Sequence, residues 1–287
     1  MNKIKIKANA KINLVLDVVG KRKDGYHDIE TIFSEISLFD NLILKKTKKG
    51  IKINIAQEVN IPQEKNLCYK AAQLFFKETR IKQGVEIFLE KNIPVGAGLG
   101  GGSSDAAATL KGLNSLFNNP LSNDNLKKIA LKIGMDVPFF IDGGCAVASG
   151  RGEKLKNIKL KKTFWLVIIK PNFSISTKEA YELIDKNLIL TKNSSYAKIM
   201  TKALGSGLLE ITESLYNIFE RVVSIQYPGF PSKLKEKFKD AGADGVLMSG
   251  SGSAVYGIFR VRRSAYQAFE KLKRIPKVKV YLAKTLL

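Results

Sequence analysis

A glycine-rich segment at residues 94–105 constrains the fold of this chain more than any other stretch of its sequence. Five of the seven residues from 96 to 102 are glycines, and two serines follow them. A strand pattern at 85–89 precedes the segment, and an Ala-rich helical pattern at 106–117 follows it. The sequence therefore predicts a strand, a glycine loop and a helix N-terminus in that order.

The chemistry of such a loop favours binding of a polyphosphate. Glycines let backbone amides approach an anion because no Cβ stands in the way. Ser103, Ser104 and the free amides of the following helix add donors, and the helix dipole adds positive potential at the same place. A tight turn that binds nothing is the alternative, but five glycines weaken a fold through backbone entropy, which favours the phosphate interpretation.

Three better-known nucleotide loops fit this segment poorly. The spacing of Gly96, Gly98 and Gly101 formally matches the dinucleotide fingerprint, but residues 121–126, about twenty positions on, read as loop and helix start. A Walker A loop needs a lysine before its final serine, and here Asp105 follows the two serines directly. The His-Arg-Asp and Asp-Phe-Gly elements of protein kinases do not occur in the sequence.

The remaining patterns predict an α+β protein of two domains, residues 1–155 and 156–287. In the first half we expect strands at 3–8, 12–19, 29–36, 42–46, 51–55 and 145–148, with helices at 67–77, where Asn66 is the N-cap, and at 123–133. In the second half we expect strands at 164–169, 245–248, 255–259 and 278–285, with helices at 177–186, 195–205, 210–222, 231–240 and 263–274. A charged stretch at 154–162 separates the halves, and the second half resembles a split βαβ, ferredoxin-like sheet covered by helices.

The composition limits the partners of the chain. Its formal net charge is +22, which invites a nucleic-acid interpretation, but 40 of the 48 basic residues are lysines scattered along the chain. Because base readout and phosphate forks favour arginine, a solvated lysine-rich surface that attracts small anions is favoured over a nucleic-acid binder. Two distant cysteines and one histidine exclude a zinc finger, a disulfide scaffold and a His-based metal centre. Without an apolar run of 18 residues or an export signal, we expect a cytoplasmic protein with no membrane association.

Several segments together resemble the GHMP kinase superfamily, which includes galactokinase, homoserine kinase, mevalonate kinase and phosphomevalonate kinase. They are Pro94–Ser104, Ala10–Leu14 and Ser249–Ser253; Gly20–His27 and Gly134–Pro138 narrow the resemblance to a branch that acts on a cytidine diphosphate-linked methylerythritol. The resemblance covers nearly the whole chain. It implies a two-domain GHMP kinase fold, with an N-terminal domain like ribosomal protein S5 domain 2 and a ferredoxin-like C-terminal domain. It also implies ATP-dependent phosphorylation of the tertiary 2-hydroxyl of this small-molecule substrate.

The resemblance also assigns an ATP site and two catalytic residues. The ATP-binding residues would be Pro94, Val95, Gly96, Ala97, Gly98, Leu99, Gly100, Gly101, Gly102, Ser103, Ser104, Asn66 and Leu67. Mg²⁺ is expected because ATP brings it, with Ser104 as its candidate hydroxyl ligand. Lys11, among strand residues, would stabilise charge at the transferred group, and Asp136, in an apolar setting, would orient or deprotonate the alcohol. The alternatives are a surface lysine, a structural turn aspartate, and a core position for Leu67.

Four residues are implied to bind the substrate: Asn13, Tyr26, His27 and Tyr181. Tyr26 and His27 would hold the cytosine, Tyr26 by stacking and the neutral imidazole of His27 through one donor and one acceptor. Tyr181 would cover the other face of the base, or else pack in the core as a helix residue. Ser251 and Gly252 would close the site through backbone contacts, although a plain hairpin turn explains them nearly as well. A sister kinase with another acceptor, or an RNA-binding protein, remains an alternative.

Overall fold

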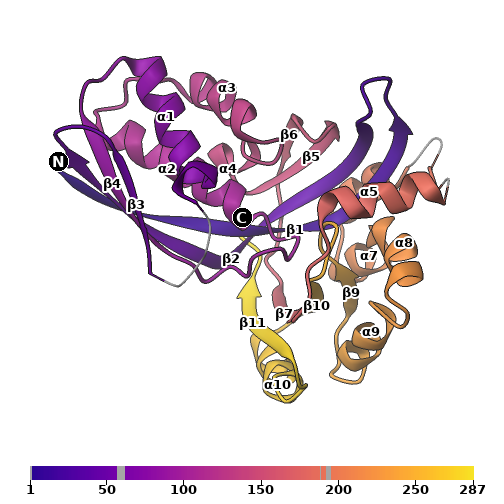
Figure 1. Cartoon of the computed structure of the whole chain (residues 1–287). Helices are drawn as coiled ribbons and strands as arrows, with labels where there is room; N and C mark the ends of the chain where they lie inside the picture. The colour runs from indigo at the N-terminus through magenta and orange to yellow at the C-terminus, as the bar shows by residue number, and fades with distance from the viewer. Residues whose placement is uncertain (1, 57–61, 188, 192–194) are drawn as a thin grey trace. The chain divides into compact units, whose positions relative to one another are not determined.

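A computed structural model of the chain describes residues 2–56, 62–187, 189–191 and 195–287 (Figure 1). The chain forms two compact units, each built from separate segments. Unit 1 comprises Met1–Ala10, Phe39–Pro94 and Gly100–Gly143, and unit 2 comprises Lys11–Leu38, Val95–Leu99 and Gly144–Leu287. The units therefore alternate along the chain, and the predicted division into residues 1–155 and 156–287 stays a prediction.

Two long strands contribute to both units. Strand β1 (Lys3–Lys21) starts in unit 1 and continues into unit 2, and β2 (His27–Thr47), to which it is hydrogen-bonded, returns in the opposite order. In unit 1, the last part of β2 pairs antiparallel with β4 (Gly84–Glu90), which pairs parallel with β3 (Ile51–Ile55). Alternate side chains of β4 are buried, as expected of a sheet with helices on one face.

The helices of unit 1 cover that sheet face. They are η1 (Gln63–Lys65), α1 (Leu67–Thr79), α2 (Gly101–Leu116), α3 (Asn123–Ile133) and α4 (Phe139–Asp142) (Figure 1). Asn66 caps α1 as predicted, because its side-chain oxygen accepts the Cys68 amide at 2.9 Å. Helix α2 packs closely on β2: a Cβ added at Gly112 would lie 3.1 Å from a methyl carbon of Leu44.

Unit 2 contains an antiparallel sheet and the first part of β2. The first part of β2 pairs antiparallel with β5 (Cys145–Gly150), and β5 pairs in turn with β6 (Lys154–Ile158). The separate four-stranded sheet has the order β11-β7-β10-β9 and consists of β7 (Trp165–Pro171), β9 (Gly245–Met248), β10 (Val255–Phe259) and β11 (Val278–Lys284). Strand β7 is interior to this sheet and buried over nearly its whole length.

Helices pack around these strands and complete the core of unit 2. They are α5 (Thr177–Lys186), α6 (Tyr196–Ala203), α7 (Leu208–Glu213), α8 (Phe219–Gln226), α9 (Ser232–Lys239) and α10 (Arg262–Leu272). Buried side chains of α5, α8, α9 and α10 form one apolar cluster with β7, β9 and β10, including Ile169, Ile184, Phe219, Phe238 and Phe259. Among the described residues, none of the helices is both long and apolar enough to span a lipid bilayer.

Most predicted elements are confirmed, and the exceptions have physical causes. Residues 3–8 and 12–19 belong to one strand, as do 29–36 and 42–46. Polar residues between the predicted segments lie inside the strands; Asp40, for example, accepts the backbone amide of Ile93 at 2.7 Å. The charged stretch 154–162 includes β6. Helix α2 begins at Gly101, so three of the five glycines lie at the cap or in the first turn of the helix.

The predicted helix at 210–222 is wrong in its middle. The chain forms α7, then β8 (Tyr216–Asn217), which pairs parallel with β1, and then α8. The Asn217 side chain donates to the carbonyls of Met248 and Gly250 at 2.7 and 2.8 Å and accepts the Phe219 amide. These tertiary hydrogen bonds outweigh the local helical pattern.

Candidate functional site

The first half of the glycine loop is held by backbone contacts inside unit 2. Gly98 has a φ of +75°, and a Cβ there would lie 2.0 Å from the carbonyl oxygen of Ser249. The Ser249 hydroxyl donates to the Gly98 carbonyl at 3.0 Å, and the Lys11 amide donates to the Leu99 carbonyl, also at 3.0 Å. Gly98 is therefore required by the fold itself, because the loop at 249–253 touches it.

The second half of the loop lies in unit 1, where it begins α2. Gly100 is the N-cap in a left-handed conformation, and a Cβ at Gly101 would lie 2.9 Å from Ile93. Gly102 differs: it is exposed, and within the part of the chain that the structure describes its Cβ would meet only Leu67, at an ordinary 3.6 Å. The first amides of a helix have no acceptor inside the helix, so this end can bind an anion.

Lys11 and Asn13 point to the same side of β1 and contact each other. The Lys11 ammonium donates to Asn13 Oδ1 at 2.6 Å, and Asn13 Nδ2 donates to the Thr31 hydroxyl at 2.8 Å. Both residues are buried, at 4% and 1% exposure. Phe33 adds a ring whose centre lies 4.9 Å from the Lys11 nitrogen. The surface-lysine alternative is wrong, because this ammonium is held inside the protein.

His27 and Tyr181 are also brought together, with Asp185 as a third member. The two rings stack with their centres 4.8 Å apart and their planes 14° from parallel. His27 Nε2 lies 2.8 Å from Asp185 Oδ1, and Lys21 donates to the other oxygen of that carboxylate at 2.8 Å. Tyr181 packs edge-on against Phe219 of the core, so its predicted core contact is confirmed while its contact with a base stays a prediction.

Tyr26 does not share this enclosed setting. Its side chain is exposed, and the Arg151 guanidinium lies over its ring at 4.5 Å from the centre. An exposed ring that already stacks with a planar cation can also present its other face to a base. The stacking role of Tyr26 stays a prediction.

Three more predicted residues belong to unit 1. Asp136 lies in the turn between α3 and α4, half-buried beside the fully buried Val137. Asn66 uses its side-chain oxygen as the cap of α1, and the next residue, Leu67, lies against Gly102 at the start of α2. Their roles at an adenine pocket, like the catalytic role of Asp136, stay predictions.

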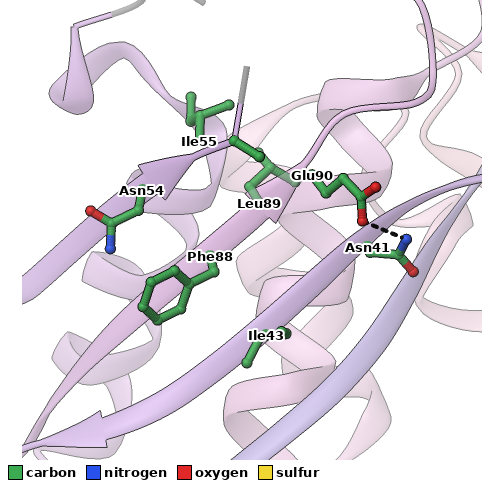
Figure 2. Close-up of a pocket in the computed structure, with 8 residues that line it drawn as sticks. Asn41, Ile43, Asn54, Ile55, Phe88, Leu89 and Glu90 are labelled. Atoms are coloured by element: carbon green, nitrogen blue, oxygen red, sulfur yellow. Dashed lines mark hydrogen bonds between the residues drawn. The ribbon is translucent and has the colours of Figure 1, made fainter. Parts of the chain in front are cut away.

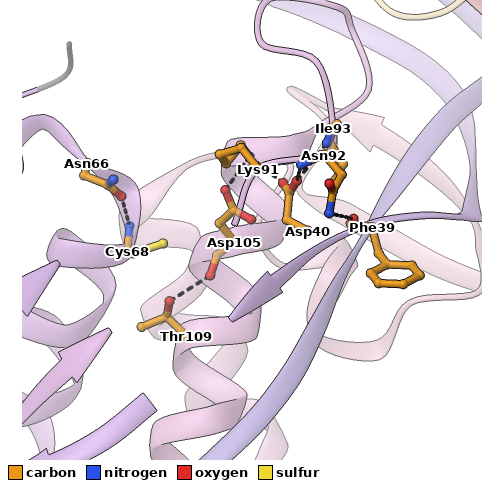
Figure 3. A network of polar contacts seen from close by, with 9 residues as sticks. All are labelled: Phe39, Asp40, Asn66, Cys68, Lys91, Asn92, Ile93, Asp105 and Thr109. Carbon is orange, nitrogen blue, oxygen red and sulfur yellow. Dashed lines mark hydrogen bonds and ion pairs between the residues drawn. The ribbon is translucent and has the colours of Figure 1, made fainter. Parts of the chain in front are cut away.

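A buried charge cluster supports the start of α2 from inside unit 1 (Figure 3). The Lys91 ammonium contacts the Asp40 carboxylate and donates to Asp105 Oδ2 at 2.6 Å. Burial raises the pKa of Asp105 to about 7, since Lys91 only partly compensates for desolvation and Asp40 adds a like charge. Among the described residues, Asp105 Oδ1 is buried without a hydrogen-bond partner. Asp105 therefore carries a desolvation penalty that its ion pair with Lys91 does not fully offset.

Unit 1 also has a pocket that involves none of the predicted site residues. It lies between β2, β3 and β4 and is lined by Ile43, Asn54 and Phe88, with the Asn41–Glu90 hydrogen bond of 3.0 Å at one end (Figure 2). Its mainly apolar lining holds neither a nucleophile nor a cluster of charges. The pocket therefore does not serve as the predicted kinase site.

The described residues contain no group of three or more His, Cys, Asp or Glu side chains that could hold a metal ion. Cys68 and Cys145 are both free and buried, and burial raises the pKa of each thiol.

Some residues that shape the site could not be recognised in the sequence. Thr31 accepts the Asn13 amide and donates to the Val15 carbonyl at 2.6 Å, and the buried Tyr256 hydroxyl donates to the Asn13 carbonyl at 2.8 Å. Asp185 contacts His27 across 158 positions of sequence. Only the Lys11-x-Asn13 spacing offered a signal, since alternate residues of a strand share a face.

Comparison with protein families and known proteins finds related sequences along nearly the whole chain. The family profile "GHMP kinases N terminal domain" matches residues 66–144, and "GHMP kinases C terminal" matches residues 199–277. A protein of Clostridium tetani (strain Massachusetts / E88) named 4-diphosphocytidyl-2-C-methyl-D-erythritol kinase is 43% identical over 99% of this chain and 100% of its own length. A protein of the same name from Clostridium botulinum (strain Kyoto / Type A2) is 42% identical over 98% of this chain and 99% of its own.

Solved structures agree with these sequence matches. A crystal structure of 4-(cytidine 5'-diphospho)-2C-methyl-D-erythritol kinase has a TM-score of 0.85 and 32% identity, and the match covers 98% of this chain and 99% of that one. A homoserine kinase from Cytophaga hutchinsonii has a TM-score of 0.76 at 22% identity, with 100% and 95% coverage, and shares the fold. The predicted two-domain α+β fold is confirmed.

The charge cluster behind α2 gives a pH-dependent prediction for stability. The pKa of Asp105 is raised in the folded protein, so folding binds a proton between pH 4 and 7, and the ionised carboxylate destabilises the fold above that range. Asp105→Asn should raise the free energy of unfolding at pH 8 by on the order of 2 kcal/mol, and this gain should shrink toward zero at pH 5. Urea denaturation of both proteins at the two pH values measures it. A difference that stays constant or grows on acidification would contradict the assignment.

Proposed function

The chain belongs to the GHMP kinase family, and from this premise we propose that it transfers the γ-phosphoryl group of ATP to the 2-hydroxyl of 4-diphosphocytidyl-2-C-methyl-D-erythritol. The observation that carries the proposal is the 43% identity, over 99% of the chain, to a relative of that name. The two free, buried cysteines agree with the cytoplasm as its compartment. The proposed binding partner of the chain is this substrate, 4-diphosphocytidyl-2-C-methyl-D-erythritol.

The start of α2 supports a role in holding the ATP phosphates. Gly102 stands in the first turn of a helix, where alanine would fit beside Leu67 and would favour the helix by about 1 kcal/mol. A glycine that the fold does not require is explained by a ligand that approaches the backbone closely. The unpaired amides and the dipole of α2 would stabilise the phosphates.

The oxygen ligands near the start of α2 suit Mg²⁺ that is bound together with ATP, with the phosphates supplying further ligands. Mg²⁺ keeps several waters and is usually held by one or two protein oxygens together with substrate phosphates. The hydroxyl of Ser104, in the first turn of α2, is the proposed protein ligand. Bound Mg²⁺ would neutralise charge on the phosphates during transfer.

Lys11 and Asp136 are the proposed catalytic residues. The Lys11 ammonium is held by Asn13 and buried on β1, so its charge acts in a low dielectric, where it stabilises a developing negative charge strongly. Asp136 would accept or orient the proton of the 2-hydroxyl, because phosphoryl transfer needs a positioned nucleophile more than a strong base.

Four residues are proposed to bind the cytidyl substrate. His27, stacked on Tyr181, would face the base edge, and the exposed ring of Tyr26 would stack on the base. Asn13 would contact the substrate beside Lys11, with its carboxamide oriented by Thr31. Ser251 and Gly252 would border the glycine loop through the contact of their loop with Gly98.

A phosphoacceptor panel tests the proposed function. ADP release would be followed with the cytidyl substrate, mevalonate, homoserine and no acceptor under the same conditions. We expect turnover only with the cytidyl substrate, because only that acceptor carries a base for His27 and Tyr26. Faster turnover with mevalonate or homoserine would instead identify a sister kinase of the same fold, and salt-sensitive RNA binding without any turnover would favour the RNA-binding alternative.

Gly102 gives a prediction for nucleotide binding. Gly102→Ala should weaken ATP binding about tenfold or more while leaving thermal stability unchanged or slightly raised, because the new Cβ meets the phosphates and not the protein. Gly20→Ala is the matched control, since a Cβ at Gly20 meets nothing within 4 Å. Titration calorimetry with ATP measures both variants. Unchanged ATP affinity in Gly102→Ala would contradict the proposal that the ATP phosphates bind at the N-terminal end of α2.

The catalytic pair gives a prediction for turnover. Asp136→Asn keeps the shape of the side chain but removes its charge and basicity, so we expect turnover to fall about 10²-fold or more with ATP binding retained. Lys11→Met should also suppress turnover, since it removes the buried ammonium. Single-turnover rates, with ATP affinity measured in parallel, separate chemistry from binding. Near-normal turnover of Asp136→Asn would make that carboxylate a structural residue of its turn.

A further inference from the structure

The single histidine of the chain has a defined hydrogen-bonding environment. His27 opens β2, and its side chain is only 4% exposed. One ring face lies on Tyr181, and Nε2 lies 2.8 Å from Asp185 Oδ1. These contacts fix the plane of the imidazole and the direction of one of its nitrogens.

Asp185 determines which nitrogen carries the proton. Burial raises the pKa of this carboxyl, but hydrogen bonds from Lys21 and His27 outweigh burial and hold the pKa below its usual value. Asp185 is therefore a carboxylate at neutral pH and can only accept hydrogen bonds. The neutral His27 ring must then carry its proton on Nε2, which leaves a lone pair on Nδ1.

The second ring nitrogen is available to a ligand. Among the described residues, Nδ1 of His27 makes no hydrogen bond, and it is not one of the side-chain atoms buried without a partner. An imidazole anchored through one nitrogen and open at the other presents a single acceptor in a fixed direction. In this state His27 would offer the base one acceptor, whereas the sequence-based expectation, which stays a prediction, was one donor and one acceptor.

We propose that Asp185 is a positioning residue that holds His27 in the Nε2–H tautomer, so that Nδ1 accepts a hydrogen bond from the exocyclic amino group of cytosine. This inference rests on the proposed function and names the origin of its base specificity. Uracil carries a carbonyl oxygen in place of the amino group, so the Nδ1 lone pair would face another acceptor. A site with an unpaired polar group rejects the wrong base strongly.

Replacing Asp185 with asparagine should reverse the tautomer. Lys21 donates to the second oxygen of Asp185 at 2.8 Å, so the amide oxygen of Asp185→Asn should turn toward that ammonium. The amide nitrogen would then donate to Nε2 of His27 and move the ring proton to Nδ1. A donor at Nδ1 suits the uracil carbonyl and opposes the cytosine amino group.

Nitrogen NMR tests the tautomer directly, because the chain has one histidine. In protein labelled with ¹⁵N-histidine, without ligand and in the neutral form of the ring reached by raising the pH, the unmutated chain should show a protonated Nε2 and an unprotonated Nδ1. Asp185→Asn should shift the pattern toward protonated Nδ1, and Asp28→Asn should leave it unchanged. Asp28 is the matched control because it adjoins His27 in sequence but pairs with Arg22. A neutral ring with its proton on Nδ1 and an unprotonated Nε2 in the unmutated protein would overturn the proposal.

Steady-state kinetics with the cytidine and uridine forms of the substrate test base selection. In Asp185→Asn we expect KM for the cytidine form to rise about tenfold or more, with kcat within about twofold, and the ratio of kcat/KM between the two forms to fall by at least as much. Asp28→Asn should keep the ratio of the unmutated enzyme. A merely structural Asp185 would lower stability and slow both forms equally, and an unchanged ratio in a folded Asp185→Asn would overturn the proposal.

The two readouts separate this inference from the proposed function. Absence of turnover with both forms in the unmutated protein would refute the kinase assignment and the cytosine contact together. Active enzyme with a protonated Nδ1 would overturn the tautomer inference alone. Active enzyme with a protonated Nε2 and a ratio that falls in Asp185→Asn supports both.

Discussion

The backbone contact between Gly98 and the loop at 249–253 is the constraint on which the glycine loop depends. A Cβ at Gly98 would lie 2.0 Å from the Ser249 carbonyl oxygen, so no other residue fits without moving a backbone. The same stretch accepts hydrogen bonds from the amides of Lys11 and Ala254. Segments far apart in sequence are thereby held together inside unit 2.

Buried polar side chains on the strands β1 and β2 are also held in place by hydrogen bonds to one another. Lys11, Asn13 and Thr31 form a hydrogen-bonded chain that ends on the Val15 carbonyl. Such a chain is stable only when each member is satisfied, because an unpaired polar group in a low dielectric is destabilising. It holds the Lys11 ammonium in one position, which is the preorganisation that the proposed catalytic role of Lys11 would need.

The sequence predicted those parts of the protein that depend on local chemistry. Asn66 before an apolar helix predicted a cap, and the glycines before an Ala-rich run predicted a helix N-terminus; both are confirmed. Residues 210–222 were mispredicted because the partners of Asn217, the Met248 and Gly250 carbonyls, lie about 30 positions away. The pairing of His27 with Asp185 was not predictable either, since a lone aspartate on a helix looks like any solvated charge until the fold brings it to the ring.

In the proposed function, the glycine loop, Lys11 and the His27 cluster serve phosphoryl transfer to one alcohol of a cytidyl substrate. The most direct measurement is ³¹P NMR of the product formed from ATP and 4-diphosphocytidyl-2-C-methyl-D-erythritol. We expect a new phosphomonoester signal on the 2-hydroxyl, appearing in step with ADP, while the two diphosphate signals of the substrate are kept. Release of ATP phosphate only as inorganic phosphate, or a phosphomonoester on another hydroxyl, would contradict it.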